Sequence, residues 1–230
     1  MAKSIEEMKF TAILPIKFNS ERVPGKNFRD FLGSPLYLHI MRSLLSVPQI
    51  SKIVVNTDAP FSEFTGDFEN PKIEFSKRPD YLLGETTSMN SIIEYEIERS
   101  NENLFFMTHT TNPLLSPSTI CEMLEVFNSK SSEHDSVVSI SKFFGRFLNS
   151  NGEPLNHNPA SLLRTQDLDP VLFENSCGYV FSRESFSSTK SRIGSQPLFF
   201  ETPKLESVDI DEEEDWLIAQ AIAEFSRRNV

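Results

Sequence analysis

The sequence is poor in cysteine and tryptophan and has no surplus of basic residues. Its 230 residues include two cysteines and one tryptophan, and 33 acidic against 22 basic residues give a formal net charge of −11. Cys121 and Cys177 form neither a disulfide framework nor a metal-ligand spacing, and they predict reduced thiols in the cytoplasm. The acidic balance argues against a nucleic-acid partner, because phosphate backbones require basic stripes.

Long apolar segments are also missing. No run approaches the roughly 20 apolar residues that span a bilayer, and the beginning, MAKSIEEMKF, lacks the apolar core of a signal peptide. We therefore expect no membrane partner. What is present is 38% hydrophobic residues, which suffices for one sizeable core. The sequence predicts a single domain over residues 1–230.

Short apolar runs alternate along the chain with helical patterns. Ser88 and Ser116 are expected to cap two helices, and Ser34 and Pro35 are expected to be the N-cap and first residue of an earlier one. A last helix is predicted over Glu212–Arg228. Strands are predicted at Phe10–Ile16, Lys52–Thr57, Lys72–Ser76, Leu104–Thr108, Ser136–Ser141 and Gly178–Ser182. The alternation predicts an α/β fold with a mostly parallel central sheet flanked by helices.

The region 144–174 interrupts this alternation. It is rich in Asn, Pro, Gly and Ser and has no long periodic face. A stretch of this length without clear helices is usually functional or forms an interface. We therefore predict that it leaves the main sheet as a small excursion that contacts the substrate or a second subunit.

A basic loop follows the first predicted strand. The apolar run Ala12–Ile16 leads into Lys17, Arg22, Lys26 and Asn27, a local reversal of charge in an acidic chain. Ligands of open α/β sheets bind at the carboxyl ends of strands, and phosphate is a common one. The loop therefore predicts a phosphate-binding site, and a solvated basic loop is the alternative.

Two carboxylates in SVDIDEEEDW form a second candidate site. If this segment is a strand, alternation places Asp209 and Asp211 on one face and Val208 and Ile210 on the other. Carboxylates so close together repel each other unless a cation lies between them, and Mg²⁺ prefers oxygen ligands and bridges to phosphate. The pair predicts a Mg²⁺ site. The alternative is an acidic helix N-terminus, because the acidic residues EEED follow directly.

Further polar residues stand at the ends of predicted strands. Asp58 ends VVNTD and Arg78 follows the third strand, at the edge of the sheet where ligands bind. His109 lies in FFMTHTTNPL, and Asn175 precedes the last predicted strand. Each has a structural alternative, namely a turn for Asp58 and Asn175, a surface position for Arg78 and a satisfied core side chain for His109.

Taken in order, these segments resemble the acylneuraminate cytidylyltransferase family, which comprises the CMP-sialic acid synthetases and relatives acting on other nine-carbon acidic sugars. The resemblance covers Ala12 to Ala221, and its most specific parts are PGKN, TQDL with EN, and DID. The other matching segments are NTD after the second strand, RPDYLLGETTS after the third, HTTNPL after the fourth, and RTQDLDPVLFENS.

The resemblance implies a Rossmann-like nucleotidyltransferase fold, a homodimer, and transfer of a cytidylyl group from CTP, with Mg²⁺ as cofactor, to an acidic 2-keto-3-deoxy sugar. It implies that Lys26, Asp211 and Lys17 are catalytic and that Asp209 and Asp211 bind the metal. The implied nucleotide contacts are Lys17, Arg22, Lys26, Asn27, Asp58, Arg78 and Ser88. The implied sugar contacts are His109, Thr111, Arg164, Gln166, Asn175 and Phe199.

The sequence departs from the family at Lys17, where Arg is usual, at His109, where Gln is frequent, and at Ser176, where Gly follows the Asn. Lys cannot form the bidentate contact of an Arg with phosphate. Two alternatives stay open. One is a 3-deoxy-octulosonate cytidylyltransferase or another sugar nucleotidyltransferase. The other, from a different class, is a non-catalytic homologue that binds a nucleotide or a sugar.

Overall fold

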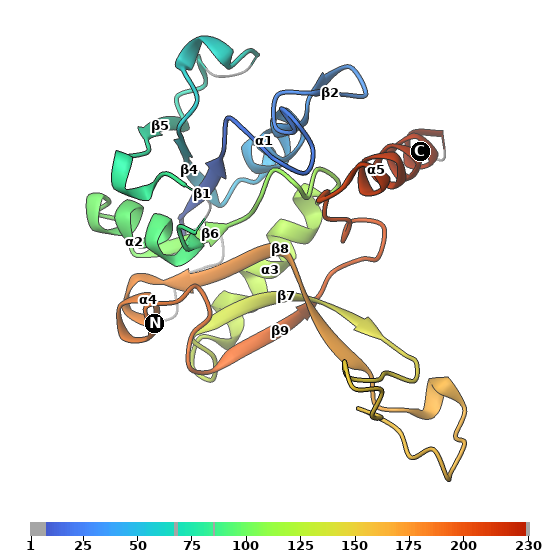
Figure 1. Ribbon diagram of the computed structural model, residues 1–230. Helices are drawn as coiled ribbons and strands as arrows, with labels where there is room; N and C mark the ends of the chain where they lie inside the picture. The colour runs from blue at the N-terminus through green and yellow to red at the C-terminus, as the bar shows by residue number, and fades with distance from the viewer. Residues whose placement is uncertain (1–7, 67–68, 85, 229–230) are drawn as a thin grey trace.

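The structure, a computed structural model, describes residues 8–66, 69–84 and 86–228 (Figure 1). The helices are α1 (Leu36–Ser46), α2 (Met89–Arg99), α3 (Pro117–Lys130), α4 (Arg183–Thr189) and α5 (Glu213–Arg228), with short 3-10 turns η2 (Phe61–Glu63), η4 (Asp80–Leu82) and η5 (Thr165–Asp167). The strands are β1 (Phe10–Ile16), β2 (Asp30–Phe31), β3 (Ser34–Pro35), β4 (Ile50–Thr57), β5 (Ile73–Lys77), β6 (Leu104–Met107), β7 (Ser136–Phe143), β8 (Val171–Ser182) and β9 (Pro197–Glu201).

One sheet organises the part of the chain that the structure describes. Its strand order is β5-β4-β1-β6-β8-β7-β9. The pairs β5–β4, β4–β1, β1–β6 and β7–β9 are parallel, whereas β8 runs antiparallel to both of its neighbours. Helices lie against the sheet on both sides (Figure 1). The predicted α/β fold with a mostly parallel sheet is therefore confirmed.

The core lies on both faces of this sheet. Successive side chains of β1 point to opposite faces, so Leu14 packs in a cluster with Ile40 of α1 and Met123 of α3, whereas Ile13 packs in a second cluster with Ile93 of α2. Every residue of β1 is buried. A strand covered on both faces reads as a continuous apolar run rather than an alternating one, which is why this strand was visible in the sequence.

Two of the predicted helix caps are confirmed. The hydroxyl of Ser88 accepts a hydrogen bond from the backbone N–H of Ser91, and that of Ser116 accepts one from the backbone N–H of Thr119. Each cap satisfies one of the donors that the first turn of a helix leaves unpaired. Helix α5 also begins with acidic and ends with basic residues, as expected. These caps fix where α2 and α3 begin relative to the sheet.

The predicted start of the first helix is wrong. Ser34 and Pro35 pair with Phe31 and Asp30 in a small antiparallel ladder, so both belong to β3, and Pro35 is the N-cap of α1 without a side-chain cap. The turn between β2 and β3 contains two residues at positive φ, Leu32 and Gly33. Such a turn closes a two-residue hairpin. The hairpin therefore takes the two residues that the sequence pattern had assigned to the helix.

The segment SVDID is not a strand. This corrects the expectation that alternation along a strand places Asp209 and Asp211 on one face. The backbone N–H of Ile210 donates to the carbonyl of Thr111 at 2.9 Å, and the side-chain amide of Asn112 donates to the carbonyl of Val208 at 3.3 Å. The segment therefore docks on the turn after β6 without a strand ladder. Ile210 and Val208 still share one apolar cluster with Trp216 of α5, so the alternation of apolar side chains was real.

Residues 144–170 leave the sheet between β7 and β8 and project from the body of the molecule (Figure 1). Residues 171–174 already belong to β8, so the strand begins seven residues earlier than the predicted Gly178. Strand β9 was not predicted at all. Within the described residues, no helix combines the length and apolar character needed to cross a membrane.

Candidate functional site

A cavity of about 690 Å³ opens where β1, β4, β5 and β6 end. Its walls come from the loops after these strands and from the start of α2. The predicted residues that line it are Lys17, Arg22, Lys26, Asn27, Asp58, Arg78, His109 and Thr111. The carboxyl edge of the parallel strands therefore brings together most of the residues assigned to the nucleotide and two of those assigned to the sugar.

The loop after β1 turns sharply at Gly25. Gly25 has φ +63°, a conformation that glycine adopts without strain, and the backbone N–H groups of Phe28 and Arg29 both donate to its carbonyl. The turn points Lys26 inward, where it is only 8% exposed. Its ammonium group donates to the carbonyl of Ile210 at 2.5 Å. A buried lysine thus joins this loop to the acidic segment.

Asp211 lies beside this corner and contacts two of the cations that line the cavity, although neither Asp211 nor Asp209 is itself among the lining residues. Its carboxylate lies 2.9 Å from the guanidinium of Arg22 and 3.5 Å from the ammonium of Lys26. Burial lowers the pKa of Lys26, and the neighbouring Asp211 and Asp209 only partly offset that effect. Arg22 and Asp211 are both substantially exposed, so this ion pair is open to an incoming ligand.

Asp209 has the features of a cation ligand. Burial raises its pKa and so does Asp211, although the hydroxyl of Thr111 and the charge of Lys26 act the other way. Its Oδ1 is buried and has no hydrogen-bond partner among the described residues. Within those residues no group of three or more His, Cys, Asp or Glu side chains is placed so that it could hold a metal ion. Two carboxylates suit Mg²⁺, which is usually held by one or two carboxylates together with water and phosphate.

Asn27 and Asp58 shape the cavity by holding loops. The hydroxyl of Thr110 donates to Oδ1 of Asn27 at 2.6 Å, and Nδ2 of Asn27 donates to the carbonyl of Lys17 at 2.6 Å. The carboxylate of Asp58 accepts from the backbone N–H of Phe18 at 2.8 Å. These bonds fix the backbone that carries Lys17. Direct contact of either side chain with a nucleotide stays a prediction.

A buried polar network holds Arg78. Its Nε donates to Oδ1 of Asn56 at 2.7 Å and its Nη2 to the carbonyl of the same residue at 3.1 Å, while Nδ2 of Asn56 donates to Glu96 at 2.5 Å. Burial lowers the pKa of Arg78, and the charges of Asp58 and Glu96 raise it. The sequence analysis did not identify Asn56 and Glu96 as parts of the site. The available signal was an acidic residue on the apolar face of α2, directly before Ile97.

His109 lies on the cavity wall after β6. Burial lowers its pKa to about 3, and the charges of Arg192 and Lys26 act in the same direction. The imidazole is therefore neutral at every pH near neutrality. Its Nε2 lies 3.4 Å from Nη1 of Arg192, a residue that the sequence analysis did not identify.

Two predicted residues are occupied by structural hydrogen bonds. The hydroxyl of Ser88 is the cap of α2, although the adjacent Thr87 and Met89 line the cavity. Asn175 is buried in β8, and its Nδ2 donates to the hydroxyls of Thr202 at 2.6 Å and Ser141 at 3.0 Å. The structure does not place these two side chains on the cavity wall. Their contacts with ligands stay predictions.

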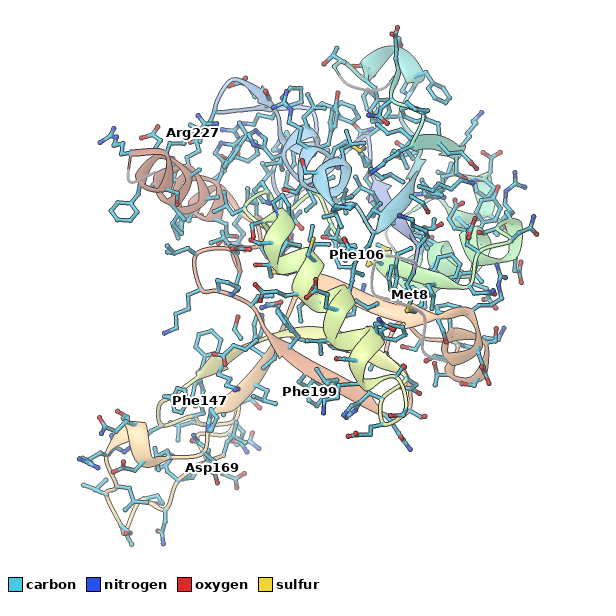
Figure 2. All side chains as sticks on the ribbon, turned by 180° about the vertical axis from the view of Figure 1, so that it is seen from behind. Met8, Phe106, Phe147, Asp169, Phe199 and Arg227 are labelled. Carbon is cyan, nitrogen blue, oxygen red and sulfur yellow. The ribbon has the colours of Figure 1, made fainter. Side chains whose placement is uncertain are left out.

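Three predicted sugar contacts lie away from the cavity of the same chain. Arg164 is in the excursion, where its guanidinium binds Asp167 at 2.6 and 3.0 Å, and Gln166 belongs to η5 of the same segment. Phe199 is exposed on β9, an edge strand of the sheet. Figure 2 shows Phe199 on the sheet, with Phe147 and Asp169 in the projecting excursion. A single copy of the chain therefore does not bring these side chains to the cavity.

Solved structures share this architecture. A CMP:2-keto-3-deoxy-manno-octonic acid synthetase complexed with CTP matches with a TM-score of 0.64 and 16% identity, covering 95% of this chain and 99% of that one. A 4-diphosphocytidyl-2C-methyl-D-erythritol synthase from Anaerococcus prevotii matches with a TM-score of 0.65 and 9% identity, covering 96% and 98%. The protein therefore has the α/β fold of the nucleotidyltransferases.

The chain belongs to the cytidylyltransferase family, whose sequence profile matches residues 11–221. It is 24% identical to the CMP-N,N'-diacetyllegionaminic acid synthase of Legionella pneumophila, covering 96% of this chain and 98% of the relative. It is 24% identical to the N-acylneuraminate cytidylyltransferase of Oncorhynchus mykiss and 25% identical to that of Streptococcus agalactiae, over 94% and 91% of this chain. The chain spans about half the length of these last two relatives.

Proposed function

We propose that this protein transfers a cytidylyl group from CTP to an acidic 2-keto-3-deoxy sugar and releases pyrophosphate. The observation that carries the proposal is the corner where the buried Lys26, which lines a cationic cavity, meets Asp211 and Asp209. Family membership supports the cytidylyl group. The names of the relatives support an acidic nine-carbon sugar. Such a reaction belongs to the cytoplasm, where CTP is available.

The reaction forms one bond and breaks one. The anomeric hydroxyl oxygen of the sugar attacks the α-phosphorus of CTP, the bond from that phosphorus to the bridging oxygen breaks, and the hydroxyl proton leaves to water. Lys26 and Lys17 line the cavity and stabilise the negative charge on the departing pyrophosphate. Arg22 adds a third cation at this wall, and positioning provides most of the remaining rate enhancement.

Asp209 and Asp211 fit a Mg²⁺ ion, because one buried carboxylate oxygen lacks a partner and the second carboxylate is accessible. When bound there, Mg²⁺ neutralises charge on the phosphate oxygens. Arg78 contacts the nucleotide from the loop after β5, where Asn56 holds its guanidinium in place. His109 and Thr111 lie on the wall after β6 and face the sugar.

We further propose a homodimer formed through the excursion. A monomer rarely leaves a large apolar area exposed without a function. The excursion and its neighbouring strands carry many exposed apolar side chains, namely Phe143, Phe144, Leu148, Leu155, Leu162, Leu163, Leu172, Phe173 and Phe199. In such a dimer, Arg164 and Gln166 contact the sugar in the cavity of the partner chain.

The proposed activity is tested by pyrophosphate release from the purified protein with Mg²⁺. Each of the four nucleoside triphosphates is combined with N-acetylneuraminate, a legionaminic acid and 3-deoxy-octulosonate. We expect turnover with CTP and a nine-carbon acid. Turnover restricted to 3-deoxy-octulosonate, or absence of a preference for CTP, would replace the proposal by the other sugar nucleotidyltransferases. Binding of CTP without any turnover would indicate a non-catalytic homologue.

The carboxylate assignment has its own test, the variant Asp211→Asn. Removing one metal-binding charge while keeping the shape is expected to reduce Mg²⁺-dependent turnover by roughly 10²-fold, the loss typical of one electrostatic contact to the transition state. Circular dichroism should show an unchanged fold. The matched control is Glu184→Gln, which removes an exposed carboxylate from α4. Full activity of Asp211→Asn would refute the assignment.

A further inference from the structure

Arg192 lies behind the cavity wall and is held firmly in place. Its side chain is 17% exposed and pairs with Glu174 at 3.3 Å. Its guanidinium lies over the ring of Tyr179, 3.9 Å from the ring centre. The hydroxyl of Tyr179 donates to the same carboxylate of Glu174. Two side chains of β8 thus fix one arginine from the loop after α4.

This arginine donates to the ring of His109. Nη1 of Arg192 lies 3.4 Å from Nε2 of His109. A guanidinium has only donors, so Nε2 must be the acceptor. A neutral imidazole carries a single proton, which must then be on Nδ1. Among the described residues Nδ1 has no hydrogen-bond partner, and His109 lines the cavity.

We propose that Arg192 is a positioning residue that holds His109 as the Nδ1-protonated tautomer and so gives the cavity a fixed hydrogen-bond donor for an oxygen of the acceptor sugar. The sugar part of this inference rests on the proposed function, whereas the tautomer does not. The charged groups near the imidazole are Arg192 and Lys26, both positive, and Glu174 faces the far side of Arg192. Burial and both cations lower the pKa of His109, so the donor is present over the working range of pH.

The tautomer is tested by long-range ¹H–¹⁵N spectra of the imidazole rings in the full chain. The sequence has four histidines, and the signals of His109 are those that disappear in His109→Gln. In the wild-type protein we expect a proton on Nδ1, a bare Nε2, and no titration between about pH 5 and 8. A proton on Nε2 of His109 in the wild-type spectrum would overturn the proposal.

The role of Arg192 is tested by Arg192→Met, which keeps the length of the side chain and removes its donors and charge. We expect a mixture of tautomers, because nothing then favours a bare Nε2, and a titration midpoint that moves upward, because one of two nearby cations is gone. An unchanged spectrum of His109 would contradict this role. Should Arg192→Met not fold, Arg192→Lys, which keeps a cation and a donor, is expected to retain the Nδ1 proton.

The matched control is Lys190→Met, two residues earlier, which removes an exposed cation paired with Glu94. It should leave the spectrum of His109 and the activity unchanged. In steady-state assays, Arg192→Met is expected to raise KM for the sugar several-fold and to change KM for CTP by less. Equal effects on both constants would indicate a merely structural arginine. If the protein shows no cytidylyl transfer but His109 carries its proton on Nδ1, the proposed function is contradicted and the role of Arg192 is not.

Discussion

Ser176 adopts a backbone conformation that is unusual for serine. Its φ is 59°, in the left-handed region, near the point where the pairing of β7 with β8 shifts register. A residue with a Cβ costs about 1–2 kcal/mol in this region, whereas glycine does not. Its hydroxyl lies 3.4 Å from that of Tyr179, which supports Arg192. The serine therefore combines backbone strain with a contact to the cluster behind the cavity.

Two variants separate these contributions at Ser176. Ser176→Gly relieves the strain and loses the hydroxyl, whereas Ser176→Ala keeps the strain and loses the same hydroxyl. We expect the glycine variant to be about 1 kcal/mol more stable than the alanine variant, after allowance for the greater freedom of glycine in the unfolded chain. Urea denaturation measures the difference. An alanine variant of equal or higher stability would show that the backbone here is not strained.

At the scale of elements, α2 supports the cavity through one buried carboxylate. Glu96 is 6% exposed on the inner face of this helix and accepts a hydrogen bond from Asn56 of β4, which in turn holds Arg78. Three segments thus meet in one chain of hydrogen bonds. A buried network of this kind stabilises the fold only while every member has its partner.

Breaking this network should affect both stability and nucleotide binding. Glu96→Leu leaves the Nδ2 of Asn56 unpaired, at a cost of about 1–3 kcal/mol, and frees Arg78 to move. We expect KM for CTP to rise several-fold, and Glu96→Gln, which keeps an acceptor oxygen, to restore most of it. The matched control is Glu94→Leu on the exposed side of α2. A rise in KM with Glu94→Leu but not with Glu96→Leu would contradict the proposed support.

The elements themselves were largely visible in the sequence. β1 is a buried run, and the caps at Ser88 and Ser116 are local signals that a window of a few residues contains. The errors arose where a contact with another segment of the chain determines the local secondary structure. The hairpin β2–β3 took Ser34 and Pro35 from the helix, and docking on the turn after β6 kept residues 207–211 from forming a strand.

The candidate site was predictable where residues follow strand ends directly. Lys17, Asp58 and Arg78 each come immediately after a strand, so the sheet alone brings them together. The supporting residues were not predictable, because their partners are remote. Asn56 and Glu96 are 40 residues apart, and His109 and Arg192 are 83 residues apart. The local sequence gives at most a sign that Glu96 is buried, and it does not indicate the partner in either pair.

At the scale of the whole molecule, the excursion is the feature that one chain does not explain. It projects from the sheet with exposed apolar side chains, and it carries Arg164 and Gln166 away from the cavity of its own chain (Figure 1). Exposed apolar surface of this kind is characteristic of an interface. The proposed second copy of the chain would account both for the surface and for the position of the predicted sugar contacts.

The proposed dimer predicts a clear effect of charge on this surface. The double variant Phe144→Glu, Leu172→Glu places two carboxylates among the exposed apolar side chains of the excursion and the adjoining start of β8. We expect a mass of two chains for the wild-type protein and of one chain for the variant, measured by analytical ultracentrifugation. The control is Leu217→Glu, a still more exposed apolar position on α5. A wild-type protein that is monomeric at micromolar concentration would contradict the dimer.

The bond between Lys26 and the carbonyl of Ile210 also has a consequence for the order of folding. Its two partners are 184 residues apart, so a ribosome delivers the lysine long before its acceptor. The strands around Lys26 are therefore synthesised before the carbonyl of Ile210 and the carboxylate of Asp211 that contact its ammonium group. Contacts between residues this far apart in sequence slow folding, because the entropy of closing the loop is lost before the contact forms. The corner of the cavity is therefore complete only once the segment before α5 has docked on the loop after β1.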